Sequence, residues 1–151
     1  MTERSIVHGT FTVERTYRHS PAVVFGAWSK PEFKRQWFGS PKEGSADDIF
    51  EFRVGGREFN EGKMGNDVYT YDVVYQDIIE NNRIIYTYQM KLTGQRISVS
   101  VATIELRPDA GGTKLVLRED GAFLDGLDTV EQREGGTNYL IDQLGAWQDK
   151  Q

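Results

Sequence analysis

The feature of this sequence that most constrains its fold is an uninterrupted series of strand-like stretches in its middle. Stretches rich in β-branched and aromatic residues follow one another, separated by short turns such as Gly55-Gly56, Asn81-Asn82 and Thr93-Gly94. Strands joined by such short turns pair with their neighbours, so the region predicts an antiparallel meander. The predicted strands span residues 49–54, 57–62, 68–79, 83–92, 95–106 and 113–120.

One strand and two short helices are predicted before the meander. Apolar and polar residues alternate in the first segment, with Phe11 and Val13 on the same face. Ser20 and Pro21 suit the cap and the first position of a helix, and Pro31 both ends that helix and suits the start of another. The predicted elements are a strand over 9–17, helices over 21–29 and 31–37, and a loop over 39–47.

The C-terminal segment changes to a helical period, which predicts a helix over residues 127–148. Gly135 and Gly136 lie in its first half, where each costs about 1 kcal/mol relative to Ala. Such a cost predicts either a break in the helix or a close approach of another surface. The predicted apolar stripe comprises Val130, Thr137, Leu140, Leu144 and Trp147, with Ile141 at its edge.

The order of elements predicts one α+β domain over residues 1–151, in which a curved antiparallel sheet wraps around the long C-terminal helix. Two short helices follow the first strand. Only the terminal helix is long enough to cover the concave face of the sheet, and a single helix fills that face incompletely. We therefore expect a pocket between the helix and the sheet.

Charge and residue usage exclude several function classes. The chain has 151 residues, with 18 basic and 23 acidic side chains and a formal net charge of −5. A dedicated nucleic-acid or anionic-membrane binder needs a basic surface, so neither is expected. No stretch has the length of a signal-peptide core or a membrane span, which indicates a cytoplasmic protein without membrane insertion.

The residues that most often carry covalent or metal chemistry are scarce. Cysteine is absent, which excludes a thiol nucleophile, a disulfide and a cysteine-bound metal. His8 and His19 are the only imidazoles, and both are expected to be solvated side chains rather than catalytic bases. We accordingly predict no metal, no cofactor and no assigned catalytic residue.

Several short motifs, in the same order along nearly the whole chain, resemble one superfamily. They are F-x-V-E-R at 11–15, S-P-x-x-V-F-x-A-W at 20–28, Trp37-Phe38, R-V-G-G at 53–56, G-T-x-L-x-L at 112–117, and Gly136 ahead of Leu140 and Leu144. The pattern resembles the START-like (SRPBCC) polyketide cyclase and lipid-transport superfamily. Within it, the chain is similar to the family named after the activator of heat-shock protein 90 ATPase. The resemblance implies the helix-grip fold of the major birch-pollen allergen.

Aromatic residues on neighbouring strands are the main candidates for a binding site. Tyr86, Tyr88 and Met90 share one side of their strand, as Tyr71 does with other tyrosines of the preceding strand. They either line the pocket or form cross-strand core pairs. Trp37-Phe38 either forms the pocket mouth or plugs the gap between helix and sheet. The predicted ligand-binding residues are Trp37, Phe38, Tyr71, Tyr86, Tyr88, Met90, Leu117, Glu119, Thr137, Leu140 and Leu144.

Two charged residues leave alternatives open. Glu119 shares strand parity with Leu117, so it either points into the pocket, where burial would raise its pKa, or lies at the wet end of its strand. In the pocket it would be a ligand anchor or an acid–base group. Arg53 either pairs with Glu51 on the same strand face or reaches a more distant carboxylate, and we favour a structural role for Arg53 and for Gly55-Gly56.

Thr137 departs from the resembled family, whose members commonly have Trp after the helical glycine. We expect position 137 to face the sheet, with Gly136 allowing a close backbone approach. A small residue there predicts a larger pocket, bordered by Thr137, Tyr86 and Tyr88. The alternative is that Trp147, Tyr139 or a strand aromatic fills the gap.

These observations support three hypotheses, in descending order. The first is non-catalytic binding of a hydrophobic or aromatic small molecule between the sheet and the C-terminal helix. The second, which the resemblance implies, is a protein-interaction module that modulates a chaperone ATPase. The third is cyclase or hydratase chemistry, with Glu119 and a tyrosine as the acid–base pair.

Overall fold

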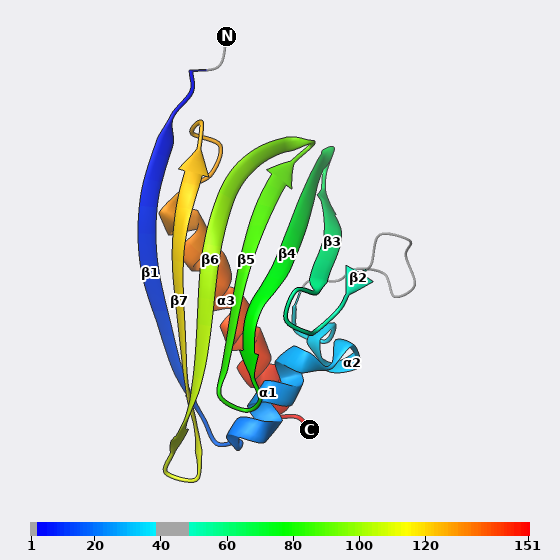
Figure 1. Cartoon of the computed structure of the whole chain (residues 1–151), viewed down its shortest axis with the longest axis vertical. Coiled ribbons are helices and arrows are strands. Elements are labelled where there is room, and N and C mark those ends of the chain that lie inside the picture. The colour runs from blue at the N-terminus through cyan, green and yellow to red at the C-terminus, as the bar shows by residue number, and fades with distance from the viewer. Residues whose placement is uncertain (1–2, 39–48) are drawn as a thin grey trace.

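A seven-stranded antiparallel sheet wraps around one long helix in the computed structural model, which describes residues 3–38 and 49–151 (Figure 1). Neighbouring strands follow the order β1-β7-β6-β5-β4-β3-β2, so the sheet is a meander to which β1 adds beside β7. The predicted helix-grip architecture is confirmed. The elements are β1 (Ile6–Tyr17), α1 (Pro21–Ser29), α2 (Pro31–Lys34), β2 (Ile49–Phe50), β3 (Arg57–Met64), β4 (Asp67–Ile79), β5 (Arg83–Leu92), β6 (Gln95–Asp109), β7 (Gly112–Leu124) and α3 (Val130–Gln148).

The long helix α3 lies behind the sheet in the view of Figure 1 and runs from the end of β7 towards α1. Its N-terminal end approaches β1 so closely that a Cβ built on Gly9 would lie 1.9 Å from Cγ2 of Val130. Further along, Arg15 of β1 donates hydrogen bonds to Asp142 and Asn138 of α3. The helix is thus attached to the β1–β7 side of the sheet, and space remains on the side of the middle strands.

The first helix begins and ends where the sequence predicts, and the second begins where predicted. The Ser20 hydroxyl accepts a hydrogen bond from the amide of Val23, and Pro21 is the first residue of α1. The second helix is shorter than predicted: it ends at Lys34, and Trp37 follows in a turn. The predicted loop over 39–47 lies outside the described residues.

Two strands, β2 and β7, end four residues away from their predicted ends, which is the largest difference among the strands. β2 ends at Phe50 rather than at Val54, because the chain turns back early: the amide of Glu51 donates to the carbonyl of Arg57, and Gly55 adopts a φ of +83°. Arg53 lies in this turn rather than on a strand, and it pairs with Glu51 at 3.4 Å, the first of the two alternatives. β7 continues past Asp120 to Leu124, since its further residues pair with β1 and β6.

The prediction for the glycines of α3 was wrong in both forms. The helix is continuous, and no atom of another element lies within 4 Å of a Cβ built on Gly135 or Gly136. Gly136 therefore allows no close approach; it faces open space. The helix starts at Val130, three residues later than predicted, where the Thr129 hydroxyl caps it by accepting from the amide of Gln132 at 3.1 Å.

The buried face of α3 is rotated slightly from the predicted stripe. Ile141 lies at its centre rather than its edge, and Leu140 and Trp147 are only partly buried. The rotation brings polar side chains onto the inner face. The buried residues of α3 are Arg133, Thr137, Ile141, Leu144 and Gln148.

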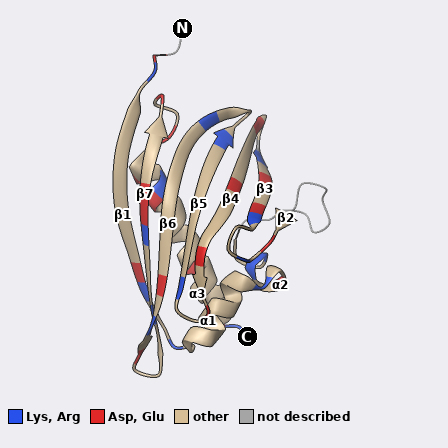
Figure 2. Ribbon diagram, viewed as in Figure 1, with Lys and Arg blue, Asp and Glu red and all other residues tan. Residues whose placement is uncertain are grey.

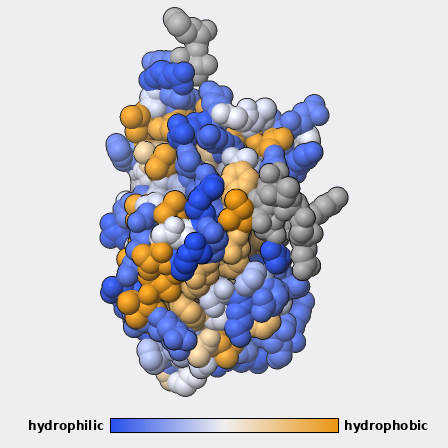
Figure 3. Space-filling model, turned by 45° about the vertical axis from the view of Figure 1, so that its right-hand side comes forward, coloured by the Kyte–Doolittle hydropathy of each residue, from blue (hydrophilic) through white to orange (hydrophobic). Residues whose placement is uncertain are grey.

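Charged residues are distributed over the sheet without a basic stripe. In the view of Figure 2, basic and acidic residues are both spread over the strands, and no blue stripe crosses the visible face. The space-filling view likewise shows patches of hydrophobic surface among hydrophilic side chains (Figure 3). Within the described residues, no helix combines the length and the apolar character that a membrane crossing requires.

Candidate functional site

A pocket of about 320 Å³ lies between the inner face of the sheet and α3. Its lining is mostly apolar and aromatic, and the charged residues in it are Glu119 and Arg133. All predicted site residues except Leu144 line it. Those that do are Trp37, Phe38, Tyr71, Tyr86, Tyr88, Met90, Leu117, Glu119, Thr137 and Leu140.

The tyrosines reach the pocket because residues of one parity on adjacent strands share the inner face of the sheet. Tyr71 of β4 lies opposite Met90 of β5. Tyr86 and Tyr88 precede Met90 on β5 at two-residue spacing. The ring centroids of Tyr71 and Tyr88 are 5.0 Å apart, and those of Tyr86 and Tyr88 are 5.8 Å apart. These tyrosines thus form aromatic pairs with one another and also line the pocket.

Trp37 acts as a packing plug at the base of the pocket. It is buried, its indole N–H donates to the carbonyl of Ala27 at 3.0 Å, and its ring packs edge-on against Trp28. Phe38 is only partly buried and packs against Tyr71. Leu144 is fully buried in the core beside the pocket and does not line it.

Thr137 borders the same pocket as Tyr86 and Tyr88, on the opposite wall. The aromatic residues that could have filled the gap beside it lie elsewhere. Tyr139 is 63% exposed, and the Trp147 ring packs against Phe33 at 5.3 Å. The space next to Thr137 is therefore part of the pocket.

Glu119 points into the protein and not to solvent. β7 continues for five residues beyond it, and the residue is only 3% exposed. The Tyr88 hydroxyl lies 2.8 Å from both carboxylate oxygens of Glu119 and donates to them. Burial raises the pKa of Glu119, and the nearby Arg133 guanidinium opposes that rise.

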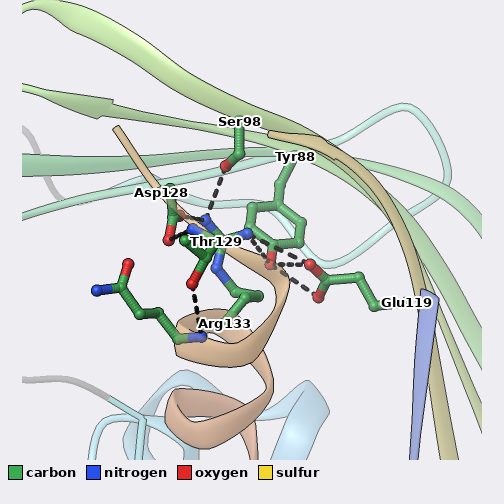
Figure 4. Close-up of polar contacts among 7 residues, drawn as sticks. Tyr88, Ser98, Glu119, Asp128, Thr129 and Arg133 are labelled. Carbon is green, nitrogen blue, oxygen red and sulfur yellow. Dashed lines mark hydrogen bonds and ion pairs between the residues drawn. The ribbon is translucent and has the colours of Figure 1, made fainter. Parts of the chain in front are cut away.

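Arg133 of α3 completes the polar end of the pocket (Figure 4). It is 9% exposed. Its Nη1 donates to the Tyr88 hydroxyl at 2.8 Å and to Glu119 at 3.3 Å. Its Nη2 donates to Ser98 at 2.8 Å and to Asp128 at 2.5 Å. We call Tyr88, Ser98, Glu119, Asp128 and Arg133 the Arg133 cluster.

Burial and the charges of the Arg133 cluster keep the Tyr88 hydroxyl protonated. Burial, followed by the negative charge of Glu119, raises the pKa of Tyr88 well above its ordinary value. Burial opposes the charged form of Arg133. Tyr88, Glu119 and Asp128 favour it, and the pKa of Arg133 is raised as a result. Among the pocket tyrosines, Tyr88 is the one whose hydroxyl donates to Glu119.

The sequence-based prediction missed Arg133. A charged residue on a predicted helix was assigned to the solvent face, although position 133 lies one helical turn before Thr137. The spacing placed it on the inner face, and only its charge argued against burial.

A second buried ion cluster lies beyond the aromatic wall and was also missed. Lys34 of α2 donates to Glu58 of β3 at 2.6 Å, and the Tyr75 hydroxyl of β4 donates to the same carboxylate oxygen at 2.5 Å. The Lys34 ammonium, with its residue only 4% exposed, also lies 4.4 Å from the ring centroid of Phe38. We call Lys34, Glu58 and Tyr75 the Lys34 cluster. It supports the pocket wall from behind.

Neither histidine lines the pocket. His19 pairs with Asp149 at 2.8 Å, and His8 lies in a shallow groove away from the pocket. Among the residues that the structure describes, no three or more His, Asp or Glu side chains come together in a way that could hold a metal ion.

The model of one protein family matches most of the chain. Residues 18–147 match the family described as activator of Hsp90 ATPase homolog 1-like protein. No curated protein sequence matches the chain.

Two solved bacterial structures are similar to this one in sequence and fold. A protein from Rhizobium leguminosarum is 41% identical, with 99% of this chain and 100% of that chain covered and a TM-score of 0.91. The Mll3558 protein from Rhizobium loti is 40% identical, with 95% and 99% covered and a TM-score of 0.88. CalU16 from Micromonospora echinospora shares the fold alone, at 18% identity, 98% and 86% coverage and a TM-score of 0.65.

Proposed function

Because the chain belongs to the family of activator of Hsp90 ATPase homolog 1-like proteins, we propose that it binds a hydrophobic or aromatic small molecule without changing it chemically. The observation that carries this proposal is the pocket between the sheet and α3. Its volume of about 320 Å³ lies within the range of small-molecule sites, and its mostly apolar lining with few polar groups is typical of them.

The fixed geometry of the lining supports binding over catalysis. Glu119 is engaged by both Tyr88 and Arg133, so its carboxylate is held in place by partners that do not need a ligand. The aromatic rings of Tyr71, Tyr86 and Tyr88 pack on one another in the same wall. A wall that is ordered in advance lowers the entropy cost of binding.

Titration with N-phenyl-1-naphthylamine, a neutral apolar fluorophore, tests the proposal. Trp28 and Trp37 line the pocket, so quenching of tryptophan emission should accompany the rise in probe emission. We expect saturable binding of about one probe per chain. Absence of saturation would contradict the proposed function.

Two glycines of α3 provide a matched pair of variants. Gly136 lines the pocket, whereas Gly135 does not, and both have open space where a side chain would begin. Replacing either by Leu removes a helical glycine and should stabilise α3 by about 1 kcal/mol. Only Gly136→Leu adds a side chain beside the pocket, so it should weaken probe binding at least about tenfold while Gly135→Leu leaves it unchanged. Equal affinities of the two variants would place the probe elsewhere.

A further inference from the structure

The polar end of the pocket has an unusual distribution of donors and acceptors. Arg133, Glu119 and Tyr88 all line the pocket, so any polar group of a ligand at this end meets them first (Figure 4). Which of their hydrogen-bonding positions are already used by the protein decides what kind of ligand group can bind there.

The four donors on the two terminal nitrogens of Arg133 are taken. Each terminal nitrogen of its guanidinium is shared between two protein acceptors: Nη1 between Tyr88 and Glu119, and Nη2 between Ser98 and Asp128. A ligand carboxylate binds an arginine best through two parallel hydrogen bonds to the guanidinium. That fork is occupied here by the protein itself.

The Tyr88 hydroxyl is also taken as a donor, because its proton is directed at Glu119. The acceptors, in contrast, are only partly used. An ionised carboxylate has about four lone-pair sites. Glu119 receives hydrogen bonds from Tyr88 and Arg133, and the Ser100 hydroxyl is a third donor beside it, so about three of these sites are used. Capacity to accept from a ligand remains.

The charges point the same way. Arg133 carries one positive charge, whereas Glu119 and Asp128 carry two negative charges when ionised, so the Arg133 cluster has no surplus positive charge for an anion. In the Lys34 cluster the ammonium is paired with Glu58. An anionic ligand would therefore enter a buried site next to a carboxylate, and no cation among the described lining residues is free to pair with it.

We propose that the pocket selects ligands whose polar end donates hydrogen bonds, a hydroxyl or a protonated amine, and discriminates against carboxylates of the same size. The donor binds the Glu119 carboxylate, and the apolar body of the ligand lies against the aromatic wall. This selectivity rests on the proposed function, since it concerns the same pocket.

Competition among three ligands with the same ten-carbon chain tests the selectivity. 1-Decanol, n-decylamine and decanoate are titrated at pH 8 against the pocket loaded with N-phenyl-1-naphthylamine. We expect decanol or decylamine to displace the probe at concentrations at least about tenfold lower than decanoate does, equivalent to about 1.4 kcal/mol. Whichever of decanol and decylamine displaces the probe at the lower concentration shows whether the pocket prefers a ligand with a neutral or a cationic polar end.

Each other outcome has a distinct meaning. If decanoate competes as well as decanol and decylamine, or better, the selectivity is refuted while the binding function stands. If the probe binds but none of the three displaces it, the selectivity is refuted as well. If the probe itself fails to bind, the proposed function fails, and the selectivity with it.

Two neighbouring acidic residues of β7 give the matched variants. Glu119→Gln removes the negative charge in the pocket, so it should weaken the donor ligand and strengthen decanoate, which narrows their ratio at least about threefold. Asp120→Asn removes a carboxylate from the outer face of the same strand, where it pairs with Arg118 and does not line the pocket, and should leave the ratio unchanged. An unchanged ratio in Glu119→Gln, with the variant folded by circular dichroism, contradicts the role given to Glu119.

Discussion

Replacing Arg133 by Met tests the energetics of the polar end directly. Methionine keeps most of the length and the apolar stem of the side chain but removes the guanidinium. The change leaves the carboxylates of Glu119 and Asp128 without their counter-charge and takes a donor from Tyr88. Because Glu119 is almost fully buried, water cannot replace the lost partner without opening the pocket.

The expected cost follows from the geometry of the pair. Nη1 of Arg133 and Oε2 of Glu119 are 3.3 Å apart. At an effective dielectric constant of about 20, two unit charges at this separation attract each other by about 5 kcal/mol. Removing one partner of a buried pair typically costs about 3–5 kcal/mol, a large part of the roughly 5–15 kcal/mol that stabilises a domain. We expect Arg133→Met to lower the free energy of unfolding by about 3–5 kcal/mol at pH 8.

The cost should fall as the pH is lowered. The pKa of Glu119 in the folded protein is raised, so its contribution to stability is present below its unfolded pKa and is lost as the pH rises through the folded pKa. Without Arg133, which opposes the rise, the folded pKa moves further up, and each unit adds about 1.4 kcal/mol to the cost at high pH. At pH 5 Glu119 takes up a proton in the variant, so the destabilisation should be smaller by at least about 1 kcal/mol.

Urea unfolding followed by circular dichroism at pH 5 and pH 8 measures both values. Arg118→Met is the control, because Arg118 pairs with Asp120 on the outer, exposed face of the same sheet. The urea midpoint of this variant should equal that of the unmodified protein. A double variant, Arg133→Met with Glu119→Gln, should recover part of the loss. A destabilisation by Arg133→Met that is the same at both pH values would refute the assigned coupling to Glu119.

Three further substitutions have definite expected outcomes. Thr137→Trp should weaken binding of N-phenyl-1-naphthylamine at least about tenfold at little cost in stability; unchanged affinity in the same titration would mean that position 137 does not border the occupied space. Gly9→Ala should lower the free energy of unfolding by about 1–3 kcal/mol, because its Cβ would overlap Val130, and the double variant with Val130→Ala should restore most of it in urea melts. Lys34→Met should destabilise by about 3 kcal/mol by leaving Glu58 buried without its cation, and adding Glu58→Gln should reverse part of that loss; additive effects would contradict the pairing.

Much of the fold could be predicted from local patterns. Turn residues at Asn81-Asn82 and Thr93-Gly94 and the apolar stripe of the last segment suffice for the order of strands and helices. The end of β7 was missed because Gly121 interrupts the strand pattern. A Cβ there would come within 2.8 Å of the Ser100 hydroxyl, so the residue is small because of a neighbouring strand that local patterns do not reveal.

The apolar part of the candidate site was predictable, and its polar part was not. The two-residue period of Tyr86, Tyr88 and Met90 is sufficient to place them on one face of a strand. Burial of Arg133 depends on acceptors from three other segments of the chain, at Tyr88, Ser98 and Glu119. No local pattern carries that information, so a charged residue on an amphipathic helix is assigned to solvent by default.

The two buried ion clusters explain how a small domain keeps such a pocket open. At about 24 cal/mol per Å³, leaving about 320 Å³ unfilled would cost at most about 8 kcal/mol relative to a packed core, comparable to the stability of a whole domain. Collapse of the walls would relieve that cost, but it would break charge-assisted hydrogen bonds on both sides. The Arg133 cluster connects α3 to β5, β6 and β7, and the Lys34 cluster connects α2 to β3 and β4. Since each cluster finds its partners within the protein, the walls stay in place without a ligand, and an apolar molecule that enters fills the pocket without having to reorganise it.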